Sequence, residues 1–290
     1  MKNLDLSKLP AKKRKQIVSC LRAGLQLLYF LFLPSVFTAA FNGVKYIFTQ
    51  LGQGEKIEMT AFVSALLLVC AFTIVFGRFF CGFACAFGSL GDAMHAIYGI
   101  ICKKRKKKPR RIKPETAKKL ALIKYGILLL IALCCFAGVY QKARGTSPWD
   151  VFSMLHAGNF RLSSYVPGIV LLLLILVGMF FEERFFCRFL CPMGAVFSLL
   201  PILPFFTLHR KRENCIRGCS ACTRQCPSAV ELPSDGSKEI SGDCFQCQKC
   251  IDTCSKGNIR CGVKELHGNE ILFTLFRAVF LLTLLLWAGI

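Results

Sequence analysis

The forty residues from Cys215 to Cys254 hold eight cysteines, in two runs separated by a seventeen-residue spacer. The first run reads Cys-x3-Cys-x2-Cys-x3-Cys-Pro, and the second reads Cys-x2-Cys-x2-Cys-x3-Cys. Thiolates at this spacing suit iron–sulfur clusters, because a tight run binds three corners of a cubane and a distant cysteine binds the fourth. The stretch therefore predicts two 4Fe–4S clusters.

In proteins that hold two such clusters, the fourth ligand of each comes from the other run. We therefore expect two ligand sets, which are Cys215, Cys219, Cys222 and Cys254 for one cluster and Cys244, Cys247, Cys250 and Cys226 for the other. Cys261 follows the second run, and we interpret it as an ordinary free thiol rather than a ligand.

A second group of cysteines lies in a repeated motif, Arg-Phe-Phe-Cys-x-Phe-x-Cys-x-x-Gly, in the segments 77–88 and 183–194. Its four cysteines are Cys81, Cys85, Cys187 and Cys191. Cysteines at positions i and i+4 of a helix share one face, so each pair can bind one side of a shared site. We predict a third iron–sulfur cluster here, either 2Fe–2S or 4Fe–4S, with a zinc ion bound by four thiolates as the alternative. Arg78 and Arg184 recur in the motif and either balance the negative charge of a cluster or anchor the helices at lipid headgroups.

The elements that position these cysteines are predicted to lie in a membrane. The 290-residue chain is 54% hydrophobic, yet its formal charge is +22. Both properties coexist when apolar spans and basic loops are segregated. A nucleic-acid-binding protein would be basic too, but it would not need long apolar segments. Because the cysteines follow metal-ligand spacing, we expect them to be reduced and to face the cytoplasm.

Five apolar segments are long enough to be considered as spans, namely 17–41, 60–76, 120–139, 165–181 and 271–290. Basic residues crowd the leader 1–16, the loop 103–119 and the turn 209–212, and they are sparse in the predicted polar loops 43–59 and 140–164. The positive-inside rule then predicts that the N-terminus and the cysteine-rich region are cytoplasmic. Segment 86–101 is apolar but weak as a span, so we expect an interfacial or re-entrant helix there.

The predicted fold is an all-α integral membrane protein of about five transmembrane helices, with two repeated two-helix hairpins and a small cytoplasmic module that is bacterial-ferredoxin-like and holds two 4Fe–4S clusters. Its predicted domains are a membrane domain at 1–209, the module at 210–265 and a C-terminal transmembrane helix at 266–290. Both hairpins run in the same sense, so they are related by an axis along the membrane normal. This arrangement brings the two cysteine pairs together at the cytoplasmic surface.

These residues resemble the NapH/NosR-type membrane polyferredoxins, a family of 4Fe–4S binding inner-membrane electron-transfer proteins. The shared features are two membrane-end Cys-x3-Cys motifs followed by two ferredoxin-like cysteine runs. Ala86 and Ser255 stand where the family pattern has proline. The resemblance implies a location in the bacterial cytoplasmic (inner) membrane. It also implies electron transfer between the quinone pool or a membrane flavoprotein and a redox partner.

The sequence has no catalytic acid–base or nucleophile constellation, so we interpret the chain as an electron-transfer subunit of an oxidoreductase system rather than a stand-alone enzyme. Its expected partners are membrane lipid and quinone/quinol or flavoprotein redox partner subunits, and not nucleic acid. Two other functions remain open. One is a metalloprotein assembly or metal-reduction factor whose soft thiolates handle copper or iron. The other is a redox-sensing membrane regulator.

Overall fold

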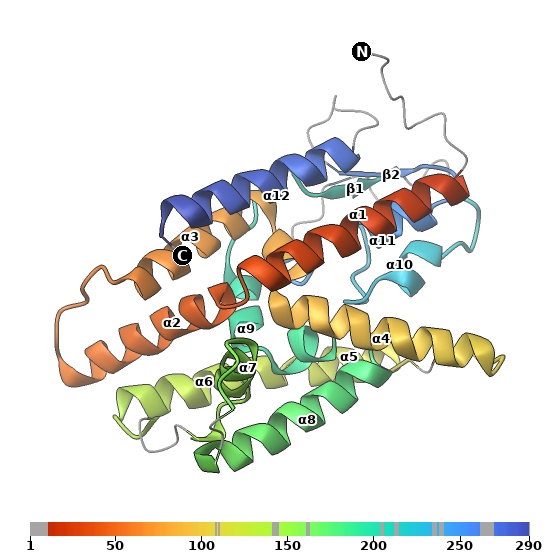
Figure 1. Cartoon of the computed structure of the whole chain (residues 1–290). Helices are drawn as coiled ribbons and strands as arrows, with labels where there is room; N and C mark the ends of the chain where they lie inside the picture. The colour runs from red at the N-terminus through yellow and green to blue at the C-terminus, as the bar shows by residue number, and fades with distance from the viewer. Residues whose placement is uncertain are drawn as a thin grey trace.

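The computed structural model describes residues 11–107, 109, 111–140, 145–160, 163–203, 206–211, 215–233, 237, 241–261 and 270–289. The first ten residues of the basic leader therefore lie outside the described residues. Helices make up most of the described chain (Figure 1), which confirms the mostly helical prediction.

The first apolar segment forms two helices, α1 (Ala11–Phe32) and α2 (Val36–Gln53), bent by 61° at a short break. The break contains Pro34, which has no N–H to donate and clashes with the preceding helical turn. The polar loop predicted at 43–59 is wrong in its first part, because α2 continues to Gln53. It ends where Gly54 adopts a left-handed conformation, with φ of 69°.

The two repeats then follow in the same order of elements. In the first, α3 (Ala61–Phe76) packs beside α2 and leads to η2 (Phe80–Ala84) and α4 (Ala86–Lys104). In the second, α5 (Pro114–Leu120) and α6 (Ile123–Phe136) precede α7 (Pro148–His156), η4 (Ser163–Tyr165) and α8 (Val166–Phe181), which leads to η5 (Phe186–Leu190) and α9 (Pro192–Leu199).

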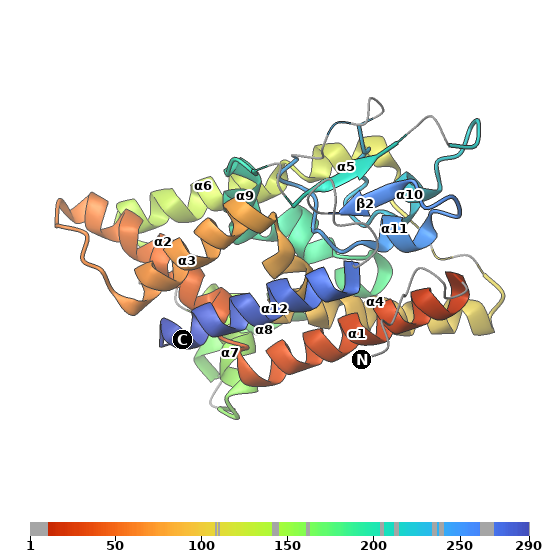
Figure 2. The same ribbon diagram turned by 90° about the horizontal axis from the view of Figure 1, so that it is seen from above.

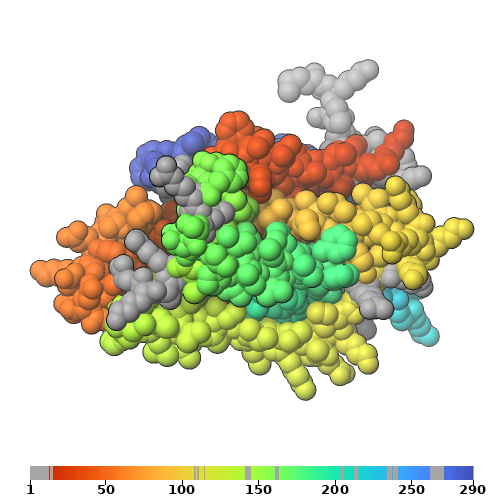
Figure 3. Space-filling view, turned by 60° about the horizontal axis from the view of Figure 1, so that its bottom comes forward, coloured from red at the N-terminus to blue at the C-terminus, as the bar shows by residue number. Residues whose placement is uncertain are grey.

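Several helices are apolar enough to lie in a bilayer. Among the described residues, Glu115–Phe136 and Ser163–Phe181 are long and apolar enough to cross a membrane, and the bent pair α1–α2 makes a third if it counts as one span. α3 and α12 (Glu270–Trp287) are apolar but shorter. Figure 3 shows α8 across the middle of one face, where it exposes apolar side chains, namely Val166, Val170, Leu171, Leu173, Leu174, Val177 and Phe181. Such a surface suits lipid, and the protein is a membrane protein.

The cysteine-rich region forms a small unit at one end of the helical bundle. Strands β1 (Leu208–Arg210) and β2 (Ile259–Cys261) pair antiparallel, with Leu208 opposite Cys261. Two short helices, α10 (Ala221–Gln225) and α11 (Lys249–Thr253), complete it. Figures 1 and 2 show this unit beside the N-terminal half of α1, while α12 runs back along the bundle next to α3.

Candidate iron–sulfur centres

Both copies of the repeated motif adopt the same unusual backbone. The first cysteine of each pair lies in a single π-helical turn, Cys81 in η2 and Cys187 in η5. The second cysteine closes that turn, because Cys85 N–H donates to Phe80 O at 2.9 Å and Cys191 N–H donates to Phe186 O at 2.8 Å. Our expectation of a regular helix with cysteines at i and i+4 is therefore wrong, since the π turn holds one extra residue. Such turns often mark functional sites.

Cys85 and Cys191 also serve as N-caps of the helices that follow, α4 and α9. Cys191 Sγ accepts a hydrogen bond from Gly194 N–H at 3.2 Å. An N-terminal helix position stabilises a thiolate, because unpaired N–H groups and the helix dipole both favour negative charge there. Each motif therefore places one cysteine within a π turn and the other at the start of the following helix.

The structure brings the four membrane cysteines together in the core. Each is no more than 5% exposed, and the thiols interact electrostatically across the two repeats. Burial raises the pKa of Cys187 to about 11 and holds the pKa values of Cys85 and Cys191 well above the ordinary value. Because cysteines bind metal as thiolates, these four buried thiols need positive charge nearby to lower their pKa values.

The arginines of the motif cross from one repeat to the other. Arg184 donates to the carbonyl oxygens of Cys81 and Gly82, the latter at 2.9 Å. A Cβ atom at Gly88 would lie 2.5 Å from Nη1 of Arg184, and one at Gly194 would lie 3.0 Å from Nη2 of Arg78. The glycine of each motif therefore makes room for the arginine of the other. Arg78 and Arg184 are only 1% and 2% exposed, so the headgroup-anchor interpretation is wrong.

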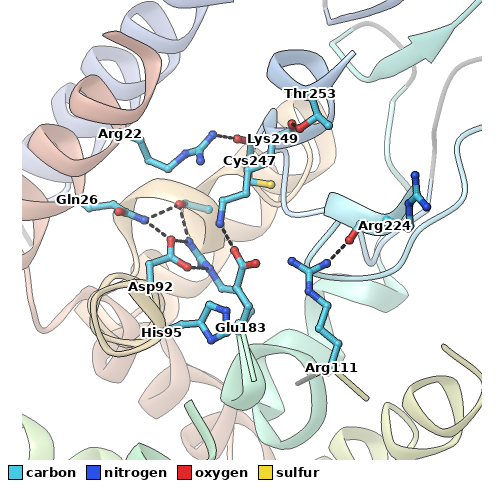
Figure 4. Close-up of polar contacts among 12 residues, drawn as sticks. Arg22, Gln26, Asp92, His95, Arg111, Glu183, Arg224, Cys247, Lys249 and Thr253 are labelled. Atoms are coloured by element: carbon cyan, nitrogen blue, oxygen red, sulfur yellow. Dashed lines mark hydrogen bonds and ion pairs between the residues drawn. The ribbon is translucent and has the colours of Figure 1, made fainter. Parts of the chain in front are cut away.

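Arg184 is held by a partly buried carboxylate of the first repeat. Its Nε and Nη2 donate to the two oxygens of Asp92 at 2.8 and 2.5 Å, and Gln26 donates to the same carboxylate at 2.7 Å (Figure 4). Burial opposes ionisation of Asp92, but the Arg184 guanidinium holds its pKa below the ordinary value. The bidentate pair fixes the orientation of the guanidinium beside the cysteines.

Arg78 is held by a carboxylate from the cysteine-rich unit instead. Its Nη1 lies 3.5 Å from Asp243 Oδ1 and donates to Ser198 Oγ at 3.2 Å. Lys124, a buried residue of α6, donates to the same Asp243 oxygen at 2.5 Å. Because Asp243 directly precedes Cys244, these contacts attach the second cysteine run to the repeats. Sequence reasoning placed Asp92 close to the motifs as a candidate for proton coupling, but it missed Asp243 and Lys124 as members of the site.

Phe245 lies at the centre of this junction. Its ring is 2% exposed, and its centroid lies 4.7 Å from the guanidinium carbon of Arg78 and 5.6 Å from that of Arg184. Arg22 of α1 donates to the carbonyl oxygen of Cys247, and Lys249 pairs with Glu183, as Figure 4 shows. The second cysteine run therefore packs directly on the membrane motifs.

The cysteine-rich unit groups its eight cysteines into two sets. Cys215, Cys219, Cys222 and Cys254 line one cavity. Asn258 donates to two of these sulfurs, through its backbone N–H to Cys254 at 3.4 Å and through Nδ2 to Cys215 at 3.6 Å. In the other set, Cys250 interacts electrostatically with Cys247, Cys244 and Cys226, and also with Cys222 of the first set. The assignment of four cysteines to each cluster stays a prediction.

Comparisons with known proteins identify the family of this chain. A family model described as a 4Fe-4S binding domain matches residues 59–109 and 166–207, which are the two repeats. An uncharacterized protein of Methanocaldococcus jannaschii is 30% identical over 206 residues, which cover 70% of this chain and 71% of the relative. The chain belongs to the NapH/NosR-type family of 4Fe–4S membrane proteins.

Two further relatives match this chain over most of their own length. A second uncharacterized protein of Methanocaldococcus jannaschii is 28% identical over 244 residues, or 83% of this chain and 93% of the relative. The ferredoxin-type protein NapH of Haemophilus influenzae is 25% identical over 217 residues, or 72% of this chain and 70% of the relative. No solved structure matches. The resemblance that the motifs predicted is therefore confirmed.

The cysteines of this chain are the ligand type that iron–sulfur clusters require, and the matched family model describes 4Fe-4S binding. Among the described residues, two buried amide donors of the second run, Gln246 Nε2 and Gln248 Nε2, have no hydrogen-bond partner. These N–H groups lie in the same run as Cys244, Cys247 and Cys250, where they could donate to cluster sulfur.

Proposed function

We propose that this chain is a membrane-bound electron-transfer subunit that passes electrons between the quinone pool or a membrane flavoprotein and a redox partner. The observation that carries the proposal is the position of Phe245 against both Arg78 and Arg184. Through this contact the second cysteine run lies against the membrane motifs with no solvent layer between them. Family membership supports iron–sulfur electron transfer as the chemistry.

Three ligand sets are proposed. The module set nearer the membrane motifs is Cys226, Cys244, Cys247 and Cys250, and the outer set is Cys215, Cys219, Cys222 and Cys254. The four membrane cysteines, Cys81, Cys85, Cys187 and Cys191, form the third. Bound iron–sulfur clusters supply one-electron transfer, with potentials set by burial, charge and hydrogen bonds to sulfur.

The protein's own residues then have defined tasks. Arg78 and Arg184 offset the negative charge of the membrane thiolates from inside the core, where screening by solvent is weak. Asn258 and Arg210 donate to sulfurs of the outer set, with Arg210 Nη1 at 3.6 Å from Cys222 Sγ. Such N–H donors stabilise the reduced, more negative state of a cluster.

The proposed topology places the N-terminus and the module on the cytoplasmic side of the bacterial inner membrane, with five spans, a membrane domain at 1–209, the module at 210–265 and a last helix at 266–290. The basic end of α4, with Lys103 and Lys104, points toward the same end of the bundle as the module (Figure 1). This agreement with the positive-inside rule supports the orientation. Lipid would cover the apolar faces of α6 and α8.

The test uses the full chain, purified anaerobically in detergent, and the variant Cys81→Ser/Cys187→Ser. We expect a soluble quinol or a reduced flavoprotein to reduce the module clusters of the wild type. In the variant, the same donor should reduce them much more slowly, while dithionite still reduces them fully. Equal rates of quinol or flavoprotein reduction in both proteins would contradict a path through the membrane cysteines.

A further inference from the structure

Arg277 of α12 is a buried cation whose role the proposed relay does not explain. Its side chain is 0% exposed, and its guanidinium carbon lies 4.6 Å from the Phe79 ring centroid and 4.4 Å from that of Phe273. Its Nε, Nη1 and Nη2 atoms have no oxygen acceptor among the described residues, and the side chain that they contact there is the Cys261 thiol. Stacking on two rings stabilises a cation only in part. A buried cation without an anion is strongly unfavourable, most of all in an apolar helix.

Arg78 and Arg184 have carboxylate partners, whereas Arg277 has none among the described residues. Arg184 pairs with Asp92 and Arg78 pairs with Asp243. Phe273, on which Arg277 stacks, packs against the buried cluster that contains Cys244, Cys250 and Cys261. Arg277 also interacts electrostatically with the sulfurs of Cys261 and Cys244.

Cys261 does not provide the missing negative charge. Its Sγ donates to Phe206 O at 3.2 Å, which requires the protonated thiol. It also lies 3.9 Å from Gln246 Oε1, a second acceptor. Cys244 is different, because it belongs to the inner cysteine set and would be a thiolate when a cluster is bound. Among the groups that the structure describes, the cluster-bound form of that set is therefore the anion available to Arg277.

We propose that Arg277 is the buried counter-charge of the inner module cluster, the one assigned to Cys226, Cys244, Cys247 and Cys250, and that it raises the midpoint potential of this cluster. The proposal rests on the proposed function, since it assumes that these cysteines bind a cluster. One-electron reduction makes the cluster more negative by one charge and moves no proton. A fixed cation therefore stabilises the reduced state more than the oxidised state.

The outer set has a weaker equivalent. Arg210 lies beside Cys222, but it is partly exposed and also donates to Leu232 O at 2.7 Å. Its effect on the outer cluster is screened by solvent, whereas Arg277 acts within the core. Arg277 therefore places the higher potential at the inner cluster, next to Phe245 and the membrane motifs. Arg277 acts through the potential of the cluster and not by contact with a substrate, and it gives α12 a role beyond anchoring the chain in the membrane.

The test is a redox titration followed by EPR on the cluster-loaded full chain, with the variants Arg277→Lys, Arg277→Gln and Arg277→Met. The lysine variant keeps the charge, and the other two remove it with different polarity and packing. We expect the potential of one module cluster to fall in both uncharged variants and to stay close to the wild-type value in the lysine variant. Arg210→Gln is the matched control and should shift the other cluster.

Each outcome decides the matter. If the uncharged variants fail to load the inner cluster while Arg277→Lys loads it, the charge is required and the proposal stands. Unchanged potentials in fully loaded uncharged variants would overturn it. So would equal failure of the lysine and methionine variants, because shape rather than charge would then be the requirement. If the wild type itself bound no cluster in the module, the proposed function would fail instead.

Discussion

Ser198 occupies in the second repeat the position that Asp92 occupies in the first, and each lies beside the arginine of the other copy. Asp92 binds Arg184 through two oxygens, but the hydroxyl of Ser198 cannot neutralise Arg78. Asp243 provides the missing carboxylate and accepts from Ser198 Oγ at 3.0 Å. The two repeats thus differ in the partner that they offer to the arginine of the other copy, and the cysteine-rich unit docks at the repeat that lacks a carboxylate there.

The first prediction concerns this docking contact. Asp243→Asn leaves Arg78 and Lys124 without a carboxylate. Breaking a buried pair costs about 3–5 kcal/mol, and partial exposure of Asp243 reduces this to roughly 1–3 kcal/mol. We expect a lower unfolding temperature in detergent and faster proteolysis between the membrane domain and the module.

A compensating variant makes this prediction specific. Ser198→Asp restores in the second repeat the carboxylate that the first repeat has. In the Asp243→Asn background it should recover part of the lost stability. No recovery, with the Ser198→Asp single variant folding normally, would show that Asp243 does not replace an internal carboxylate.

The second prediction concerns the close approach of Gly88 to Arg184. Gly88→Ala places a methyl group against the guanidinium and against the carbonyl oxygen of Cys81, 2.7 Å from that oxygen. We expect loss of iron from the membrane site, measured as iron and sulfide per chain. Gly99→Ala is the control on the same helix, because a Cβ there meets nothing within 4 Å. It should keep its iron and gain up to about 1 kcal/mol of stability, since alanine favours helix. Equal iron contents in the two variants would rule out this role for Gly88.

A third prediction separates Cys261 from the eight cysteines of the module. Because Cys261 donates to Phe206 O, it should behave as a thiol that binds no iron. Cys261→Ala should therefore keep the wild-type iron content and EPR signals. Cys254→Ser should lose the outer cluster, because Cys254 lines the cavity of that set. Iron loss from Cys261→Ala would make it a ligand and contradict the assignment.

Residue type and spacing predicted much of the candidate site. Cys215, Cys219, Cys222 and Cys254 line one cavity, and the repeated motif has the same backbone twice. The π turns were not predictable, because a Cys-x3-Cys spacing fits an α-helical turn as well as a π-helical turn. Asp243 and Arg277 were missed for another reason. Their partners lie far away in the sequence, and a single charged residue in an ordinary segment does not reveal them.

The helix boundaries show a similar limit. Pro34 predicted a break, and the chain bends there. The polar residues after position 43 predicted a loop, but α2 continues through them, because packing against α3 outweighs their local preference. The apolar pattern alone also placed Arg78 and Arg184 at the membrane surface. Only the three-dimensional pairing with the opposite repeat accounts for their burial.

The central claim is that the membrane cysteines and the inner module set form one continuous relay. EPR of the fully reduced protein tests it most directly, because closely spaced paramagnetic clusters broaden and split each other's signals. The account predicts such coupling in the wild type. It also predicts simplified module signals and a lower iron and sulfide content in Cys81→Ser/Cys187→Ser. Unchanged iron, sulfide and EPR signals in that variant would contradict the claim.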